Sequence, residues 1–520
     1  MESKRNENRK RTVAVIGGGA AGMMAAIEAA RAGAIVTLIE KNPQLGKKLA
    51  TTGNGRCNYT NLDMGDRIGG KFRGFHPEFA EATLDVLPPE AVLDWFRAIG
   101  VEPRFRGSYV YPNSDQASAV VDALREELHR LSVKVHYNAE VKSVQRIDTD
   151  TEVSAAKASM PGKAASAGIP AKATLSDDGA AASSSQIRRK RDAGYFLIQC
   201  TDAVVKADRV ILAAGSKAAP KTGSNGDGYF IARKLGHTIV PYVPALCGIR
   251  CAGDAFRALA GIRTEAALEL SIDGRCVDRE VGELQLVDYG ISGIPVFQLS
   301  RYAAYALQEG KKAVVYINFL PGFTEAGAVH DSDRNVASGA AVRNSKRASS
   351  ASGISTIEAS AAKNAQNARA EVSCCAAKAE DPKDLAVQLF RQRQERLAGR
   401  KMESFFTGLL HQKLGQLLLR MANVRPELPV AELSEKQLRS LASLSVRFKA
   451  ECVEMNGFQQ AQVVAGGIDT TEIDPSTMAS RLVPGLYFAG EVLDIDGICG
   501  GYNLQWAWAS GFVAGRHAAG

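Results

Sequence analysis

Three glycines near the N-terminus have the spacing that phosphate binding requires. The run Val-Ile-Gly-Gly-Gly-Ala-Ala-Gly places them at Gly17, Gly19 and Gly22. Gly17 permits a sharp turn out of a strand, Gly19 lets the backbone approach a pyrophosphate, and Gly22 allows a helix to pack closely on the strand. Free N–H groups and the dipole at the start of that helix favour anions. The run predicts a dinucleotide-binding turn; the alternative is a purely structural glycine turn.

A carboxylate and a polar loop follow the glycine turn. Glu40 comes directly after an apolar strand, where its side chain can accept hydrogen bonds from both hydroxyls of an adenosine ribose. Glycine spacing does not distinguish NAD from FAD. The next run, 47–58, is dense in glycine and polar residues where a nicotinamide domain would continue with an ordinary helix. Such a loop can extend beside a long cofactor, with Arg56 contacting a phosphate or the flavin edge. The alternative is a surface loop.

The C-terminal part of the chain carries a second strand, glycine loop and helix. The strand ends in Gly490 and Glu491, whose carboxylate can bind ribityl hydroxyls. The run 497–505 then opens a helix, whose N–H groups can contact the flavin N1–C2=O edge and stabilise the negative charge of reduced flavin. The alternative is a structural glycine-rich turn. Two further glycine loops, 211–215 and 222–228, are weak signals on their own.

The elements that must position these residues follow the pattern of a nucleotide-binding fold. A strand over 12–16, a helix over 20–32 and a strand over 35–39 form a β-α-β unit around the glycine turn. The segment 241–323 has short strands with glycine turns, which is typical of a small β-barrel or sandwich. The other expected elements are a helix over 117–131, strands within 133–144, 195–200 and 209–213, a Leu-rich helical block over 382–444, strands within 446–464, and a strand, loop and helix over 485–515.

Two segments differ in composition from the rest of the chain. Residues from about 151 to 192 and from about 325 to 381 are rich in Ala, Ser, Lys and Gly, with little apolar periodicity. They cannot bury enough apolar surface to offset their ordering entropy, so we expect exposed, flexible insertions that carry no chemistry. The expected domains are an FAD-binding domain over 12–240 and 469–520, a β-barrel domain over 241–324 and 446–468, and a helical subdomain over 382–445.

The composition argues against several classes of protein. With 520 residues, 45% of them apolar, the chain can bury more than one core. No apolar run reaches the ~18–20 residues of a membrane span, and the N-terminus does not resemble a secretory signal. The nine scattered cysteines predict reduced thiols in the cytoplasm, and no second pair or His cluster completes a metal site with Cys247 and Cys251. The net charge of +8 predicts solubility, and no nucleic-acid motif accompanies it, so no nucleic-acid partner is expected.

Taken together, the motifs resemble a known family. The N-terminal glycine turn, the Thr-Gly-Asn-Gly-Arg-Cys-Asn loop, the Thr-Gly-Ser-Asn-Gly-Asp-Gly loop and the ending Gly-Glu-Val-Leu-Asp-Ile-Asp-Gly…Gly-Gly-Tyr-Asn-Leu-Gln are similar to those of bacterial NAD(P)/FAD-dependent oxidoreductases, the aminoacetone-oxidase-like flavoproteins. The resemblance covers nearly the whole chain except the two insertions. It implies an α/β fold with a discontinuous, Rossmann-like FAD-binding domain of the two-dinucleotide-fold type, an inserted β-barrel and a small helical subdomain.

The motifs and the resemblance together give one set of expected FAD contacts. Val141 belongs to the set because the strand after the 117–131 helix would lie against the adenine. The full set is Gly17, Gly19, Ala20, Ala21, Gly22, Glu40, Lys41, Gly53, Asn54, Arg56, Cys57, Asn58, Val141, Ala214, Gly490, Glu491, Gly501, Asn503 and Leu504.

The activity that the resemblance implies is a reduction. NAD(P)H, docking transiently, would reduce FAD, and the flavin would pass hydride to a conjugated C=C bond of a small, steroid-like 3-oxo substrate such as a bile acid intermediate. The neighbouring carbon needs a proton, for which Tyr502 and Cys499 are candidates and Tyr109 and Tyr111 are weaker ones. Each of these residues also has a structural alternative. The sequence does not indicate the oligomeric state.

Two other functions stay open. No second glycine fingerprint for a nicotinamide is present, so the substrate itself can be the reductant and oxygen the oxidant, as in a flavin-dependent amine oxidase of the aminoacetone type. Alternatively, the flavin is structural, and basic clusters at 9–11 and 188–191 bind RNA or a protein partner. Flavin reduction by NADH or NADPH, by amines, or by no donor would separate the three hypotheses.

Overall fold

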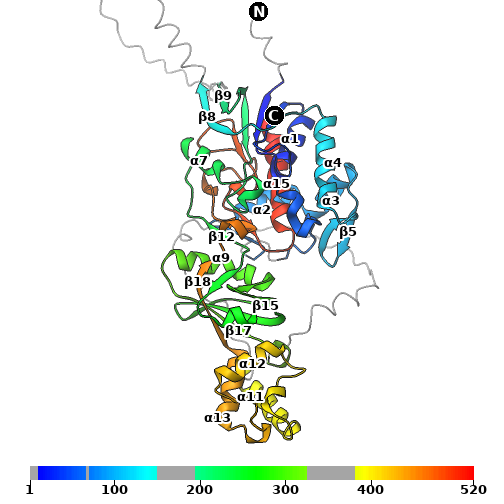
Figure 1. Cartoon of the computed structure of the whole chain (residues 1–520). Coiled ribbons are helices and arrows are strands. Elements are labelled where there is room, and N and C mark those ends of the chain that lie inside the picture. The colour runs from blue at the N-terminus through cyan, green and yellow to red at the C-terminus, as the bar shows by residue number, and fades with distance from the viewer. Residues whose placement is uncertain (1–9, 66–69, 149–193, 325–380) are drawn as a thin grey trace, which may run out of the picture.

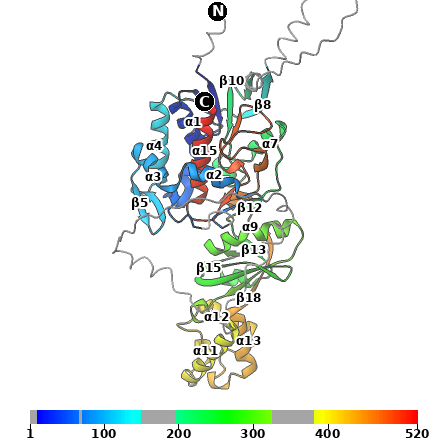
Figure 2. The ribbon, with the colours of Figure 1, turned by 180° about the vertical axis from the view of Figure 1, so that it is seen from behind.

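The computed structural model describes residues 10–65, 70–148, 194–324 and 381–520. These residues form an elongated molecule of three parts: an α/β domain at one end, a β-barrel in the middle and a group of helices at the other end (Figures 1 and 2). The two Ala/Ser-rich segments expected to be flexible lie outside the described residues, apart from Asp381, as do the basic cluster at 188–191 and Arg9. Across the described ranges, no helix is both long and apolar enough to pass through a membrane.

The α/β domain is built on one parallel sheet with the strand order β20-β11-β1-β2-β7. Apart from the edge strand β7, its strands are mostly apolar, as expected for a parallel sheet that is covered on both faces. They are β1 (Thr12–Ile16), β2 (Ile35–Ile39), β7 (Lys134–His136), β11 (Arg209–Leu212) and β20 (Leu486–Phe488). Since β20 pairs directly with β11, which pairs with β1, the two ends of the chain share this sheet.

Two helices that begin at the glycine loops pack together beside the sheet. They are α1 (Ala20–Arg31) and α15 (Tyr502–Ala519). A Cβ at Gly511 would lie 2.5 Å from the Ala21 carbonyl oxygen, and one at Gly515 would lie 2.4 Å from the Ala25 carbonyl oxygen. Glycine at these two positions therefore lets the helix backbones touch, and the first turn of α1 lies beside the middle of α15.

Smaller elements complete the α/β domain. An antiparallel sheet holds β10-β9-β8, a second holds β3-β6-β5, and β4 pairs with β21. Their bounds are β3 (Thr60–Asn61), β4 (Phe72–Arg73), β5 (Pro103–Arg106), β6 (Tyr109–Pro112), β8 (Val141–Asp148), β9 (Gly194–Cys200), β10 (Val204–Ala207) and β21 (Asp496–Gly497). The helices are α2 (Phe79–Val86), α3 (Pro89–Ala98), α4 (Ala117–Arg130) and α7 (Asp227–Lys234).

The middle part is a closed barrel with the strand order β13-β16-β15-β14-β17-β18. Helix α9 (Ile294–Gln308), which contacts β15, β12 and β18, lies on the side that faces the α/β domain (Figure 1). The barrel strands are β13 (Ile249–Cys251), β14 (Arg263–Ile272), β15 (Arg275–Val287), β16 (Gly290–Ser292), β17 (Ala313–Asn318) and β18 (Phe448–Met455), with the short helix α8 (Ala255–Leu259). The expected fold class, a discontinuous Rossmann-like domain with an inserted barrel and a helical subdomain, is confirmed.

The chain enters and leaves the barrel through one two-stranded connector. In it, β12 (Val243–Ala245) pairs antiparallel with β19 (Val463–Ala465). The helical subdomain is inserted between β17 and β18 and shares a core with the barrel. Its helix α13 starts with a capping box in which Ser434 and Gln437 bond each other's backbone N–H. The helices are α10 (Pro321–Thr324), α11 (Pro382–Arg396), α12 (Gln412–Met421) and α13 (Glu435–Val446), and α14 (Gly457–Gln460) follows β18.

Candidate functional site

A large cavity lies where the α/β domain meets the barrel and the connector. Its volume is about 940 Å³, near the upper end of the ~300–1,000 Å³ of small-molecule sites. The glycine turn before α1, the loop 46–54, the loop 489–491 and the start of α15 form most of its wall. The N-termini of α1 and α15 both open onto this space, so two sets of free backbone N–H groups face one cavity.

The turn between β1 and α1 depends on backbone contacts that only glycine permits. Gly17 has φ +105°, and a Cβ there would lie 2.5 Å from the carbonyl oxygen of Ala213, the residue that follows the neighbouring strand β11. A Cβ at Gly22 would lie 1.8 Å from the Gly17 carbonyl oxygen. A Cβ at Gly19 would meet nothing within 4 Å, because this residue borders the cavity. Gly17 and Gly22 therefore shape the turn, and Gly19 leaves room for a ligand.

Glu40 at the end of β2 is buried and holds the turn in place. Its Oε2 accepts a hydrogen bond from the Gly18 N–H at 2.7 Å, and its Oε1 accepts one from the Asn42 N–H at 2.8 Å. Oε1 also accepts a hydrogen bond from Asn42 Nδ2, so of the about four acceptor positions of a carboxylate one is left for a ligand hydroxyl. Beside it, Lys41 Nζ donates to Asn225 Oδ1 at 2.7 Å and to Asp227 Oδ2 at 2.8 Å, which links the 222–228 glycine loop to this end of the cavity.

The polar loop after Glu40 folds into a kinked 3₁₀ segment, Leu49–Gly55. Gly53 and Asn54 adopt left-handed backbone conformations at the kink, and both line the cavity. Arg56 is exposed and does not reach the cavity, because the kink carries the chain outward at that point. Cys57 turns inward with φ +59° and is fully buried beneath the loop, where burial raises its pKa to about 12.

The start of α15 is fixed by a reciprocal side-chain contact. Asn503 Oδ1 accepts a hydrogen bond from the Gly497 N–H at 2.8 Å, and Asn503 Nδ2 donates to the Gly497 carbonyl oxygen at 2.8 Å. Gly501 has φ +98°, and a Cβ there would lie 2.8 Å from the Thr60 carbonyl oxygen. Gly490, with φ +77°, sits so close to α1 that a Cβ would lie 2.7 Å from the Ala21 Cβ. The glycine motifs from the two ends of the chain thus touch.

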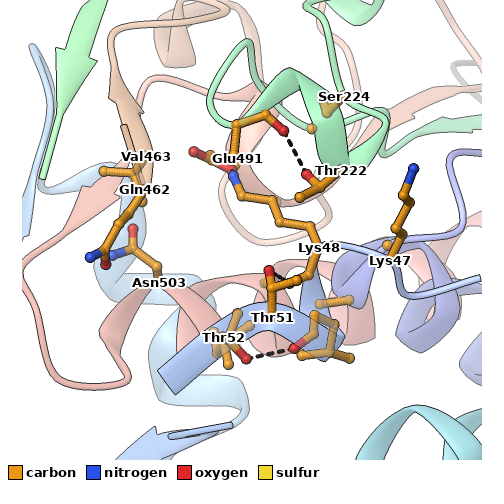
Figure 3. Close-up of a pocket in the computed structure, with 18 of the residues that line it drawn as sticks. Lys47, Lys48, Thr51, Thr52, Thr222, Ser224, Gln462, Val463, Glu491 and Asn503 are labelled. Atoms are coloured by element: carbon orange, nitrogen blue, oxygen red, sulfur yellow. Dashed lines mark hydrogen bonds and ion pairs between the residues drawn. The ribbon is translucent and has the colours of Figure 1, made fainter. Parts of the chain in front are cut away.

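An ion pair occupies the middle of the site. Lys48 Nζ lies 2.7 Å from Glu491 Oε2, while Glu491 Oε1 accepts a hydrogen bond from the Val464 N–H of the connector at 3.1 Å. In Figure 3 Lys48 extends toward Glu491, with Gln462 and Asn503 on one side and Lys47 on the other. Glu491 therefore ties the loop after β20 to the connector as well as to the loop that follows β2.

The structure gathers all but three of the expected FAD contacts around this cavity. The exceptions are Gly22, which packs against Gly17, and Arg56 and Cys57, which point to solvent and into the core. Of the proton-donor candidates, Cys499, Tyr109 and Tyr111 line the cavity. Tyr502 does not, since its hydroxyl is turned away to donate to the Asp63 carbonyl oxygen at 2.9 Å.

Sequence reasoning missed the wall that the barrel and connector provide. This wall includes polar side chains and apolar ones, and among the apolar ones Ile294 is 62% exposed. No short motif marks these positions, because they come from several separate strands, helices and loops. The residues are Leu246, Arg263, Gln285, Ile294, Phe297, Gln459, Gln460 and Gln462.

These features fit FAD. The cavity joins a phosphate-binding turn to a second helix N-terminus, and Asn58 Oδ1 at its wall is buried with no hydrogen-bond partner. A buried amide oxygen normally has a partner, so Asn58 marks a place where a ligand donor is expected. The turn 17–19 and Glu40 would hold the adenosine diphosphate half. The loop 53–58 and the start of α15 would hold the flavin half.

Behind the cavity, buried charges join α9 of the barrel to the α/β domain. Arg301 lies 3.4 Å from Asp496, and their side chains are 9% and 2% exposed. Asp494 accepts a hydrogen bond from the Phe75 N–H at 2.7 Å, and burial raises its pKa to about 7. Arg73 Nη1 donates to the Gln298 carbonyl oxygen at 3.0 Å, whereas its Nε is buried without a partner.

Comparison with known proteins places these observations in context. The sequence matches the family described as HI0933-like protein Rossmann domain over residues 11–168 and 173–517. It is 35% identical to 3-dehydro-bile acid delta(4,6)-reductase of Clostridium scindens, with 98% of each chain covered. It is 25% identical to ribosomal RNA dihydrouridine synthase of Escherichia coli, with 96% of each chain covered.

Solved structures resemble the chain less closely. The structure of 3-ketosteroid delta1-dehydrogenase from Sterolibacterium denitrificans aligns with a TM-score of 0.42 and 12% identity, covering 98% of this chain and 99% of that one.

Proposed function

Since this chain belongs to the HI0933-like Rossmann-domain family, as the motif resemblance had indicated, we propose that it is an FAD-dependent reductase that uses NAD(P)H to reduce a conjugated C=C bond of an apolar, steroid-like 3-oxo compound. The observation that carries the proposal is the shared cavity. The cofactor-binding motifs form one side of it, and a partly exposed apolar wall from the barrel forms the other.

FAD would lie along the α/β side of the cavity and supply hydride transfer once it is reduced. The free N–H groups of α15 would stabilise negative charge on the flavin edge that they face. The Lys48–Glu491 pair would place an ammonium donor inside the same cavity. The barrel wall, with Leu246, Ile294 and Phe297, would exclude water from the opposite side.

The substrate class is inferred from the barrel wall and from one relative. Exposed Ile294 and the neighbouring Phe297 need an apolar partner to be removed from water. A rigid polycyclic ketone provides such a surface together with an enone. The relative that is 35% identical carries the name of a bile acid reductase, and its match extends through the barrel and helices as well as the cofactor motifs.

A second candidate is reduction of a pyrimidine C=C bond in RNA. It is supported by relatives named ribosomal RNA dihydrouridine synthase, which are 25% and 24% identical to this chain. The chemistry at the flavin would be the same, because both reactions add a hydride and a proton across an activated C=C bond. The substrate would differ in size, and its binding would depend strongly on salt concentration.

A stopped-flow study of the purified holoprotein tests the proposal. NADH, NADPH and aminoacetone are each mixed anaerobically with the protein, and the flavin absorbance is followed. The reduced protein is then mixed with an enone steroid acid, with ribosomal RNA, or with oxygen. We expect a nicotinamide to reduce the flavin and the enone to re-oxidise it faster than oxygen does. Reduction by aminoacetone but by neither nicotinamide would instead support the amine oxidase, and re-oxidation by RNA alone would support the second candidate.

A further inference from the structure

On the barrel side, the cavity has one cationic side chain beside an apolar surface. We propose that Arg263 binds a carboxylate at one end of the substrate, so that the preferred substrate is an apolar enone acid and not a neutral ketone. This inference rests on the proposed function, since it specifies the substrate class of that same site.

The two sides of the cavity differ in how their charges are matched. On the cofactor side, Lys48 pairs with Glu491 and Lys41 pairs with Asp227. Among the described residues that line the cavity from the barrel and the connector, Arg263 alone is charged, and the others are apolar residues, glycine or glutamine. A ligand on this side therefore meets one positive charge in the lining and no carboxylate.

The direction of the Arg263 side chain follows from the barrel strands. Arg263 begins β14 and lies directly opposite Gln285 of β15 in the antiparallel ladder, so the two side chains are on the same face of the sheet. Leu284 and Leu286, on either side of Gln285, are buried in the core of the barrel. Because side chains alternate along a strand, Gln285 and Arg263 point out of the barrel, and both line the cavity.

The start of α9 lies against the same barrel strand. A Cβ at Gly293 would lie 2.4 Å from the Glu283 carbonyl oxygen of β15, and α9 runs beside β15 where the barrel faces the α/β domain (Figure 1). Ile294 and Phe297 are three residues apart on α9, so they share one side of the helix, and both line the cavity. An apolar surface and the Arg263 guanidinium therefore belong to one wall.

The guanidinium of Arg263 has donors left for a ligand. In the described parts of the chain its side chain makes a single hydrogen bond, from Nη1 to Glu283 Oε1 at 3.3 Å, and the two side chains are 65% and 59% exposed. An exposed ion pair of this kind contributes little to stability. A guanidinium has five N–H donors in a planar fork that matches a carboxylate. A substrate carboxylate can therefore bind Arg263 without breaking a buried bond, and the Gln285 amide lies beside it.

The exposure of Arg263 decides which end of the substrate enters the cavity. Taking a carboxylate out of water costs far more free energy than taking an apolar ring out of water, so the charged end stays near the exposed Arg263. The apolar end then passes Ile294 and Phe297 toward the cofactor side. The substrate must therefore carry its anion and its reactive C=C bond at opposite ends.

The first test compares an enone steroid acid with its methyl ester in steady-state kinetics. The wild type should show a KM about tenfold lower for the acid, the lower end of what a charge-assisted hydrogen bond contributes, because Arg263 is exposed. Arg263→Met should remove this preference while kcat and KM for the ester stay at wild-type values, and Arg263→Lys should keep part of the preference.

The matched control is Arg250→Met. Arg250 is another exposed barrel arginine, 3.8 Å from Glu454, and it does not line the cavity. This variant should keep the preference for the acid. Equal KM values for acid and ester in the wild type, or a preference that survives in Arg263→Met, would overturn the inference.

The second test asks whether charge carries the preference. Raising the salt concentration should raise KM for the acid in the wild type, because salt screens exposed charges, and should leave KM for the ester unchanged. Glu283→Gln removes the carboxylate that competes for Arg263, so it should lower KM for the acid about twofold. A higher KM for the acid in Glu283→Gln would contradict an anion site at Arg263.

The third test separates the substrate carboxylate from the other anion that the reaction brings to the cavity, the phosphates of the nicotinamide. Anaerobic flavin reduction by NADH and by NADPH is timed in the wild type and in Arg263→Met. We expect the same rates in both proteins. A slower reduction of the variant would assign Arg263 to the nicotinamide and overturn the inference.

The fourth test does not depend on turnover. The saturated ketone acid and its methyl ester are titrated into the oxidised holoprotein, and the change in flavin absorbance gives Kd. Arg263→Met should raise Kd about tenfold for the acid and leave that of the ester unchanged. If neither enone re-oxidises the wild-type flavin, the proposed function itself fails. If both enones do so equally well in the wild type and in Arg263→Met, only the role of Arg263 is overturned.

Discussion

The two sides of the cavity are built in different ways. On the cofactor side, backbone atoms of residues close in sequence form the surface, and Gly17, Gly22 and Gly490 are needed where another atom lies within van der Waals distance. On the barrel side, side chains from distant segments meet, among them Leu246, Phe297 and Gln462. A site made of backbone is specified by short motifs, whereas a site made of side chains is specified only by the whole fold.

The largest effect is expected on the cofactor side from Gly22→Ala. The new Cβ would lie 1.8 Å from the Gly17 carbonyl oxygen, and neither backbone can move without displacing the turn. Overpacking of this kind costs about 1–3 kcal/mol, so we expect FAD affinity to fall up to ~100-fold. The affinity is measured by titrating the apoprotein with FAD and following the flavin fluorescence. Gly322→Ala is the control, since a Cβ there meets nothing within 4 Å. Unchanged affinity in Gly22→Ala would mean that the turn is less tightly packed.

On the barrel side, Arg301→Met removes the partner of a buried carboxylate. A permanently charged Asp496 would cost about 3–5 kcal/mol, but burial already raises the pKa of Asp496, so it can take up a proton instead. We expect a loss of about 2 kcal/mol in the free energy of unfolding, measured by urea denaturation of the holoprotein. The double variant with Asp496→Asn should recover part of that loss. Equal stability of the single and double variants would show that the pair is not coupled.

A smaller effect is expected at the apolar wall. Phe297→Ala should raise KM for an enone steroid about tenfold, equivalent to ~1.4 kcal/mol of lost apolar contact, with kcat and FAD affinity nearly unchanged. Steady-state kinetics measure the change. Val277→Ala, on an exposed barrel position away from the cavity, serves as the comparison. A proportional loss of FAD affinity in Phe297→Ala would show that the two sides are not independent.

A pH dependence of stability is expected from Asp494, in the same buried group of charges. Because burial raises the pKa of Asp494 to about 7, the folded protein keeps a proton that the unfolded chain loses from about pH 4 upward. Stability should therefore fall as pH rises from about 4 to 7, by at most ~1.4 kcal/mol per pH unit for one proton, and level off above that range. Asp494→Asn should flatten the slope of Tm against pH. If the slope of Tm against pH is unchanged in Asp494→Asn, other titratable groups cause the pH dependence.

The difference between the two sides of the cavity also explains which parts of the site could be predicted from the sequence. The turn at Gly17, the strand ending at Glu40 and the loop before Asn503 could be placed because their function depends on local backbone geometry. Arg56 was expected to contact the cofactor, but it is exposed after a kink in which Gly53 and Asn54 both adopt left-handed backbone conformations. The barrel wall could not be predicted, because Gln462 meets Ile294 and Phe297 of α9 only when the whole chain is folded.

The connector has a consequence for motion. The chain enters and leaves the barrel through two short paired strands, and one of these, β19, donates the Val464 N–H to Glu491 inside the cavity. A rotation of the barrel would pull on that hydrogen bond and so on the Lys48–Glu491 pair. One rotation of the barrel would then both open the cavity to a substrate and change the electric field around the flavin.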